Sequence, residues 1–136
     1  MVDYGCVSSY INRDGTHRNL QQEKDFSGNL LFASIDSINY KYPSRRCEMT
    51  SLGYYLLHMM NEFVITGKYI QVQDRPDLLE KIRGYKQNLT LKDLCPNPRS
   101  QVLKSYFEEV NGMQYQDRPF YSKLKHILTL ELMKYK

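Results

Sequence analysis

The chain has 136 residues, of which 41% are hydrophobic and 25% charged, a composition typical of one globular domain or part of one. Its formal charge of +4 permits acidic proteins, phosphopeptides or nucleic acid as partners but specifies none of them. The first residues do not resemble a signal peptide, and no apolar run is long enough to span a bilayer. We therefore expect a soluble, intracellular protein.

Three cysteines, Cys6, Cys47 and Cys95, are widely spaced and odd in number. No C-x-x-C motif and no neighbouring pair of histidines accompanies them, so neither a disulfide framework nor a zinc site is indicated. Free thiols in a reducing compartment are the simplest interpretation.

The first 50 residues lack helical periodicity and contain the turn signals "NRDG" and "SGN". We predict a long irregular segment over residues 1–50 and a helical part over residues 51–136. The two parts meet close to a pair of arginines.

The first predicted helix covers residues 51–65 and is apolar in nearly every direction. A helix of this kind belongs at the centre of a domain. The helices expected after it each bury only one stripe, so they cannot enclose it. Either the irregular first part of the chain or an element outside it must supply the remaining cover.

Three amphipathic helices are predicted after that, each with one apolar stripe, over residues 75–84, 98–112 and 118–136. Gly84 and Gly112 are expected to end the first two of them. Between these helices, Thr90 and Asp93 predict a capping box that opens a short turn at residues 90–94.

Three blocks of sequence then occur in an order known from one group of kinases. "VDYG" at residues 2–5 resembles the D-F-G triad in its D-Y-G form, and residues 26–57 resemble the G-T and S-R-R…L-G-Y blocks of that group. "YQDRPFYSKLKHIL" at residues 115–128 is similar to the signature of its last helix. Over nearly its whole length the chain therefore resembles the casein kinase I and vaccinia-related kinase group, most closely its poxviral pseudokinases.

The resemblance implies a mainly α-helical, partial protein-kinase C-lobe over residues 1–136, with the N-lobe absent. The activation segment corresponds to residues 1–50 and the later helices of the lobe to residues 51–136. In this group the helix after the activation segment is the buried axis of the lobe. That role explains why the predicted helix at residues 51–65 is apolar on nearly every side.

The resemblance begins at the magnesium-binding triad, so the glycine-rich loop, the strand lysine and the catalytic loop have no counterpart here. We expect no phosphoryl transfer by the chain alone and no cofactor, with Mg-ATP bound only if an N-terminal kinase part completes it. The expected role is protein binding, to a related cellular kinase or its binding proteins, in the host cytoplasm or nucleus if the chain is viral.

Two alternatives stay open. The chain could be the C-terminal part of a serine/threonine kinase that a separate N-terminal piece completes. It could also be a small nucleic-acid-binding protein, although its lysines are scattered and no known module is present. Our expectation is that it binds neither specific nucleic acid nor membrane.

Several positions gain a role from the resemblance. Asp3 matches the aspartate that holds magnesium on ATP. Gly28 and Asn29 match the G-T pair, but Asn29 replaces a threonine that contacts the catalytic groups. Glu48 replaces an aspartate that points inward from the axis helix, and its extra methylene should strain that buried site. Both replacements indicate a degenerate kinase.

Arg45 and Arg46 match the S-R-R block, which the resemblance links to recognition of acidic or phosphorylated substrates. The alternative is that Arg46 packs inward against a carboxylate, which leaves Arg45 as the anion site. Asp36 stands at the glutamate position of the A-P-E motif, and Arg118 at that of the arginine before the last helix. We expect Asp36 and Arg118 to form a structural ion pair.

Overall fold

The computed structural model describes residues 7–60 and 75–133. Its helices, in chain order, are α1 (Ile35–Ile38), α2 (Arg45–Met59), α4 (Arg75–Gln87), α5 (Leu91–Leu94), the short 3-10 helix η1 (Ser100–Leu103), α6 (Lys104–Asn111) and α7 (Tyr121–Met133). Over these described ranges the β-type pairing consists of two isolated bridges, Ile11 with His17 and Gln22 with Lys41. The fold is therefore mainly α-helical, as predicted.

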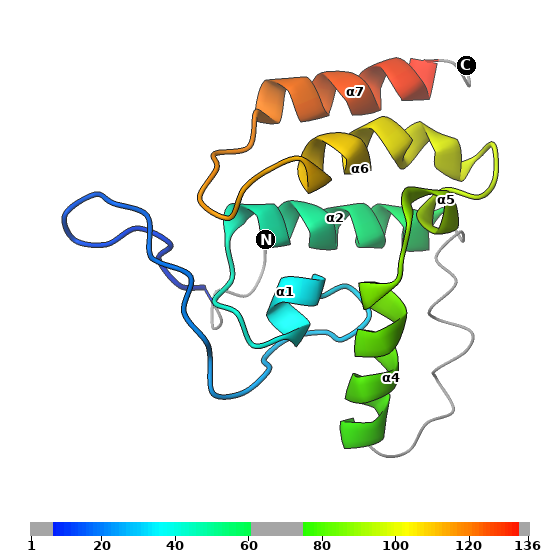
Figure 1. Ribbon diagram of the computed structural model, residues 1–136. Helices are drawn as coiled ribbons and strands as arrows, with labels where there is room; N and C mark the ends of the chain where they lie inside the picture. Colours follow the sequence, from blue (N-terminus) through cyan, green and yellow to red (C-terminus); the bar gives the residue numbers. More distant parts are fainter. Residues whose placement is uncertain (1–6, 61–74, 134–136) are drawn as a thin grey trace.

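Helices α2, α6 and α7 lie side by side as a stack with α6 in the middle (Figure 1). Helix α4 lies below α2 in the view of Figure 1, at a steep angle to the stack, and α1 packs against α4. The N-terminal segment, drawn in blue, forms a loop that extends away from the helices (Figure 1), and Phe26 and Leu30 that follow it pack against the core. The core lies mainly between α2 and α6, where Tyr54, Leu57 and Phe107 are buried.

Helix α2 begins at Arg45, six residues before the predicted start. The hydroxyl of Ser44 accepts a hydrogen bond from the backbone N–H of Cys47 and caps the helix. A second serine cap at Ser34 opens α1 inside the segment predicted to be irregular. The prediction of an irregular segment over residues 1–50 is therefore wrong in two places, where α1 and the first turn of α2 follow a capping serine. The predicted helical residues 61–65 lie outside the described residues.

Gly53 allows α2 and α6 to approach closely. A Cβ atom at this position would lie 2.6 Å from a ring carbon of Phe107 and 3.1 Å from one of Tyr106. The Tyr106 hydroxyl donates a hydrogen bond of 2.8 Å to the carbonyl oxygen of Met49, on the facing helix. The α2–α6 contact is thus close-packed on one side of α2.

The opposite side of α2 is only partly covered. Leu52, Tyr55 and Met59 are 40%, 45% and 62% exposed, although the sequence predicted a helix at the centre of a domain. Phe32 from the N-terminal part contacts Tyr55 edge to face, with 5.7 Å between ring centroids. The first part of the chain therefore supplies some of the expected cover and leaves an apolar strip exposed.

Helix α4 does not end at the predicted Gly84 but continues to Gln87. Gly84 does not adopt the left-handed backbone of a helix end, and the next turn brings Lys86 into the interior, where it is 4% exposed. Helix α6 ends at the predicted Gly112. The first turn of the helix predicted over residues 98–112 is the separate 3-10 helix η1. Helix α7 begins at Tyr121, three residues after the predicted start.

The predicted capping box opens α5. The backbone N–H of Thr90 donates to the Asp93 carboxylate over 2.9 Å, and the backbone N–H of Asp93 donates to the Thr90 hydroxyl over 3.2 Å. Cys47 and Cys95 are buried free thiols, in agreement with the sequence, whereas Cys6 lies outside the described residues.

Candidate functional site at the start of helix α2

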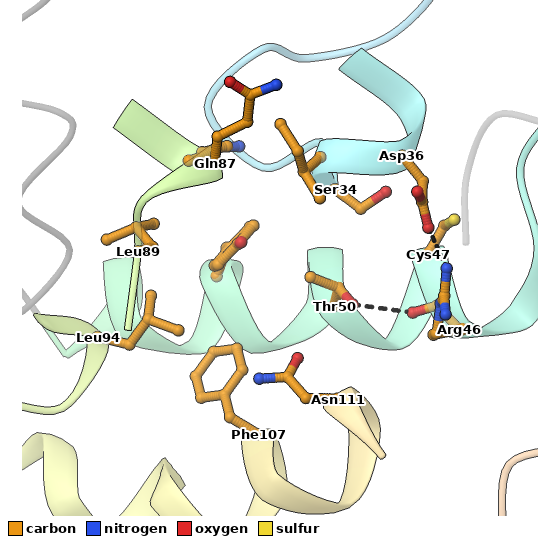
Figure 2. Close-up of a pocket in the computed structure, with 13 residues that line it drawn as sticks. Ser34, Asp36, Arg46, Cys47, Thr50, Gln87, Leu89, Leu94, Phe107 and Asn111 are labelled. Carbon is orange, nitrogen blue, oxygen red and sulfur yellow. Dashed lines mark hydrogen bonds and ion pairs between the residues drawn. The ribbon is translucent and has the colours of Figure 1, made fainter. Parts of the chain in front are cut away.

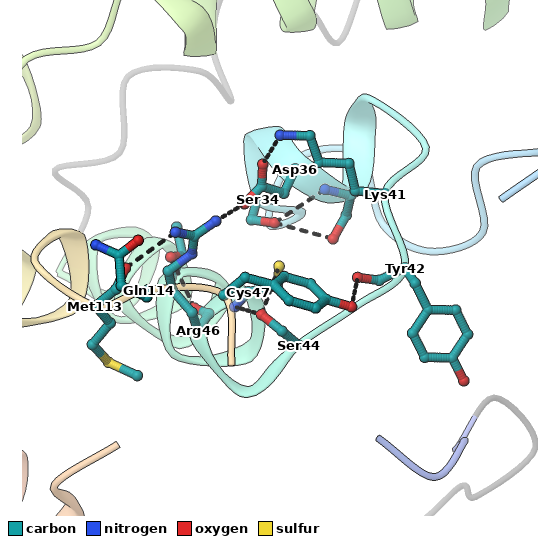
Figure 3. A network of polar contacts seen from close by, with 12 residues as sticks. Ser34, Asp36, Lys41, Tyr42, Ser44, Arg46, Cys47, Met113 and Gln114 are labelled. Carbon is teal, nitrogen blue, oxygen red and sulfur yellow. Dashed lines mark hydrogen bonds and ion pairs between the residues drawn. The ribbon is translucent and has the colours of Figure 1, made fainter. Parts of the chain in front are cut away.

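Asp36 on α1 receives hydrogen bonds from two cations. Lys41 donates from Nζ over 2.7 Å, and Arg46 donates from Nη2. The other terminal nitrogen of Arg46, Nη1, donates to the carbonyl oxygen of Met113 over 3.1 Å, as Figure 3 shows. Arg46 therefore links α1, the first turn of α2 and the loop before α7.

This pairing determines the protonation of Asp36, whose side chain is only 12% exposed. Burial alone would raise the pKa of this carboxyl group. The hydrogen bonds and positive charges of Lys41 and Arg46 outweigh burial and hold the pKa of Asp36 below its usual value. The pair is therefore ionised at neutral pH.

Arg45 points elsewhere. Its Nη2 donates to the carbonyl oxygen of Gln116 over 3.0 Å, and its guanidinium group lies 4.5 Å from the ring centroid of Tyr10. Its Nε is buried, with no hydrogen-bond partner among the described residues. Arg45 lines a cavity of about 260 Å³ that Glu48 also lines. A carboxylate beside this arginine weakens the attraction of an external anion.

These contacts join three segments that are far apart in the sequence. Arg45 and Arg46 contact the loop at residues 113–116 through its carbonyl groups, and the Tyr115 hydroxyl donates to the carbonyl oxygen of Tyr42 over 3.1 Å. Ser44 caps the helix between them. Arg46 is thus paired with a carboxylate of the protein, as the alternative interpretation of the S-R-R block predicted. The predicted anion-binding role of Arg45 stays a prediction.

The predicted ion pair between Asp36 and Arg118 is wrong. Both oxygens of Asp36 are already bonded, by Lys41 five residues later and by Arg46 on the next helix. Arg118 is exposed in the loop before α7. The nearer arginine takes the position that the resemblance had given to Arg118.

The expected buried strain at Glu48 is also absent, because this side chain is exposed on the first turn of α2. Gly28 has a φ of 136°, which favours glycine. The side-chain oxygen of Asn29 accepts a 2.9 Å hydrogen bond from the backbone N–H of Leu31 and so stabilises the following turn. Asp3 lies outside the described residues, so its predicted metal role stays a prediction.

Sequence reasoning missed Lys86. Its Nζ donates to the carbonyl oxygens of Leu30 and Leu31 over 3.0 and 2.8 Å and also to that of Ala33, and it lies 4.6 Å from the centroid of the Tyr54 ring. Burial lowers the pKa of Lys86 to about 7. The sequence did indicate that Lys86 is buried, because this residue follows Leu79 and Ile82 at helical spacing and so lies on the inward stripe of α4.

No group of three His, Cys, Asp or Glu side chains among the described residues could hold a metal ion. Among the helices of the same ranges, none is long and apolar enough to cross a bilayer.

Comparison with known proteins relates the chain to kinases. No family model matches it. Two probable casein kinase I homologues of Encephalitozoon cuniculi match 95% and 94% of the chain at 22% and 25% identity. A probable serine/threonine-protein kinase of fowlpox virus matches 93% of it at 25% identity. The chain covers only 42%, 40% and 41% of these proteins. Together with the helical architecture, the matches support a partial kinase C-lobe.

Proposed function

We propose that these 136 residues form a non-catalytic, pseudokinase-type module that acts by binding another protein through the outer face of α2. The observation that carries the proposal is the apolar strip of Leu52, Tyr55 and Met59, which are 40%, 45% and 62% exposed. Their spacing of three and four residues places them on one side of the helix. Contiguous exposed apolar side chains are typical of protein-interaction surfaces.

The partner we propose is a kinase-like polypeptide. The matched part is only about two fifths of each of the three relatives, and we propose a polypeptide like the remaining part as the partner. Phe32 and His58 contact each other beside the strip, with ring centroids 5.4 Å apart, and add an aromatic border to it. An aromatic and aliphatic surface of this composition suits another packed helix or loop.

The charge distribution favours a protein partner over nucleic acid. Lys41, Lys81 and Lys123 are each paired with a carboxylate of the chain, and Lys86 is buried. Paired lysines attract phosphates less than a continuous basic stripe would. These four lysines of the described residues therefore do not form a continuous basic face.

The absence of catalysis is part of the proposal. Phosphoryl transfer requires a lysine on the phosphates, a base for the hydroxyl group and residues that hold magnesium. Within these 136 residues, only the D-Y-G block at residues 3–5 resembles any of these parts. A carboxylate without the rest of the cleft binds magnesium weakly.

The test uses a defined partner, the part of the fowlpox virus kinase outside its match to this chain. Calorimetry should detect binding to the intact chain. Replacing Leu52 and Tyr55 together by Glu should weaken that binding more than about tenfold, because the charges would be buried in the interface. Leu130→Glu is the matched control, since this leucine is 47% exposed on α7 and should have no effect. Equal binding by all three proteins would contradict the proposed surface.

A second candidate is a kinase completed in trans, favoured by the coverage of only about two fifths of each relative. The same complex would be given Mg-ATP and casein. Phosphate transfer by the complex but by neither part alone would support the completed kinase, and its absence would support the binding module. Transfer by the chain alone would overturn the non-catalytic proposal.

A further inference from the structure

Three backbone carbonyls before helix α1 converge on one side chain at the end of helix α4. The Nζ atom of Lys86 donates to the carbonyl oxygens of Leu30 and Leu31 over 3.0 and 2.8 Å, and also to that of Ala33. An ammonium group has three N–H donors, so all of them are used here. Lys86 therefore restrains the backbone before and after Phe32.

The restrained segment, residues 29–33, is a tight turn that we call the strap. The backbone N–H groups of Phe32 and Ala33 both donate to the carbonyl oxygen of Asn29, over 3.2 and 2.9 Å. These bonds shape the turn but do not connect it to a helix. The bonds from Lys86 do, because they tie the strap to α4.

The ammonium group of Lys86 is difficult to replace in this position. The side chain is 4% exposed, and none of the ion pairs among the described residues includes it. A cleft of about 410 Å³, where α1, the end of α4 and α2 meet, could supply water to the strap (Figure 2). One water molecule in the place of the ammonium group has only two donors for three carbonyl oxygens. Part-buried acceptors without a donor are unfavourable, so the strap would loosen without Lys86.

The side chain of Phe32 connects the strap to the outer face of α2. Its ring contacts the ring of Tyr55, with 5.7 Å between centroids, and that of His58, with 5.4 Å between centroids. Both contacts border the apolar strip that carries the proposed protein interaction. Lys86 and Phe32 thus link α4 to this surface through one short segment of backbone.

We propose that Lys86 is a positioning residue of the α2 interaction surface. By holding the strap, it keeps the ring of Phe32 against Tyr55 and His58, and so gives the strip the aromatic border that the partner contacts. The inference deepens the proposed function and rests on it for the identity of the partner. The positioning itself is a property of the chain without a partner, which allows the two to be tested separately.

NMR of the free full chain tests the positioning. Lys86→Met keeps the length of the side chain and removes its three donors. It should shift the ring signals of Tyr55 and His58 in the same direction as Phe32→Ala does, because both changes take the ring current of Phe32 away from them. Lys86→Gln retains two donors and should give a smaller shift in that direction.

Arg83→Met is the matched control for these variants. Arg83 is another cation of α4, and its Nη2 donates to a backbone carbonyl oxygen, that of Ile38 in α1, over 3.2 Å. It does not bond to the strap, so its replacement should leave the ring signals of Tyr55 and His58 in place. Equal shifts in the Arg83 and Lys86 variants would overturn the proposal, as would unchanged ring signals in Lys86→Met. Unfolding of both Lys86 variants would also overturn it, because it would show a general structural role.

Calorimetry with the same part of the fowlpox virus kinase tests the effect on binding. Phe32→Ala and Lys86→Met should each weaken binding about threefold to tenfold, the usual contribution of an aromatic pair. The double variant should bind no more weakly than Phe32→Ala alone, because Lys86 acts through Phe32. Additive losses would overturn the proposal. If the intact chain does not bind this partner, the proposed function fails, whereas the NMR comparison still decides whether Lys86 positions Phe32.

Discussion

Asp36 and Arg46 form an ion pair that joins helix α1 to the first turn of helix α2. The same arginine contacts Met113, so one side chain connects the N-terminal part of the chain with the loop before α7. The pair is largely enclosed, with side chains 12% and 26% exposed. Its loss should therefore affect the whole fold.

Asp36→Ala should lower the free energy of unfolding by about 2–3 kcal/mol, because it leaves the cations of Lys41 and Arg46 without their shared carboxylate. Urea denaturation of both proteins measures the difference. Asp77→Ala is the control, since Asp77 pairs with Lys81 on the surface of α4, where both side chains are about half exposed. That change should stay within about 0.5 kcal/mol. Equal losses would show that the Asp36 pair is an ordinary surface contact.

Gly53→Ala should destabilise the protein by about 1–3 kcal/mol, because the new methyl group would overlap the buried ring of Phe107. Gly84→Ala gives the opposite expectation. Gly84 also lies inside a helix, but no atom lies within 4 Å of a Cβ at that position, so alanine should stabilise by about 0.5–1 kcal/mol. Thermal melts of the two variants compare these effects. A stabilised Gly53→Ala protein would contradict the close approach of α2 and α6.

Lys86 should make stability depend on pH. Burial lowers its folded-state pKa to about 7 from its ordinary value of 10.5, so the folded protein binds fewer protons than the unfolded chain between these values. The free energy of unfolding should therefore rise from pH 7 to pH 9 by up to about 1 kcal/mol per pH unit. Above its ordinary pKa of 9.0, Cys95 acts in the opposite direction, because burial raises its folded-state pKa to about 11.

The measurement is chemical denaturation at several pH values in the native protein and in Lys86→Met. Methionine keeps the length of the side chain but cannot titrate, so the rise between pH 7 and pH 9 should be absent from the variant. An identical pH profile in both proteins would show that Lys86 does not titrate in this range. The comparison cancels the contribution of every group that both proteins share.

Thr90→Ala should cost about 1 kcal/mol of unfolding free energy, because it removes the side-chain cap of α5 and half of the capping box. Thr129 provides the control. Its hydroxyl donates to the carbonyl oxygen of Lys125 within α7, and alanine is the better helix former there, so Thr129→Ala should be neutral or slightly stabilising. Calorimetric melting of both variants distinguishes a lost cap from a general effect of losing a hydroxyl group.

The helical class, the capping box at Thr90 and the end of α6 at Gly112 follow from local chemistry, and the sequence predicts them. The starts of α1 and α2 also depend on local serine caps, at Ser34 and Ser44. They were not predicted, because both lie in a segment rich in turn-forming residues, where no helical periodicity is visible. Tertiary packing decides the end of α4, since the interior site for Lys86 extends the helix past Gly84.

The candidate site was less predictable, because its partners are close in space and distant in the sequence. The resemblance placed Asp36 and Arg46 in separate roles, and their pairing depends on how α1 meets α2. The exposure of Glu48 likewise depends on which segments cover the first turn of α2. No residue pattern within one helix carries that information.

The contacts between the first turn of α2 and the loop before α7 have a consequence for the order of folding. The bonds Arg46–Met113, Arg45–Gln116 and Tyr115–Tyr42 span 67, 71 and 73 residues of chain. Closing a loop of this length costs several kcal/mol of chain entropy before any contact forms, so contacts of this span slow the search for the native state. Refolding should therefore be slower than in a helical bundle of local contacts. Substitutions at these arginines should mainly speed unfolding, because their bonds form late.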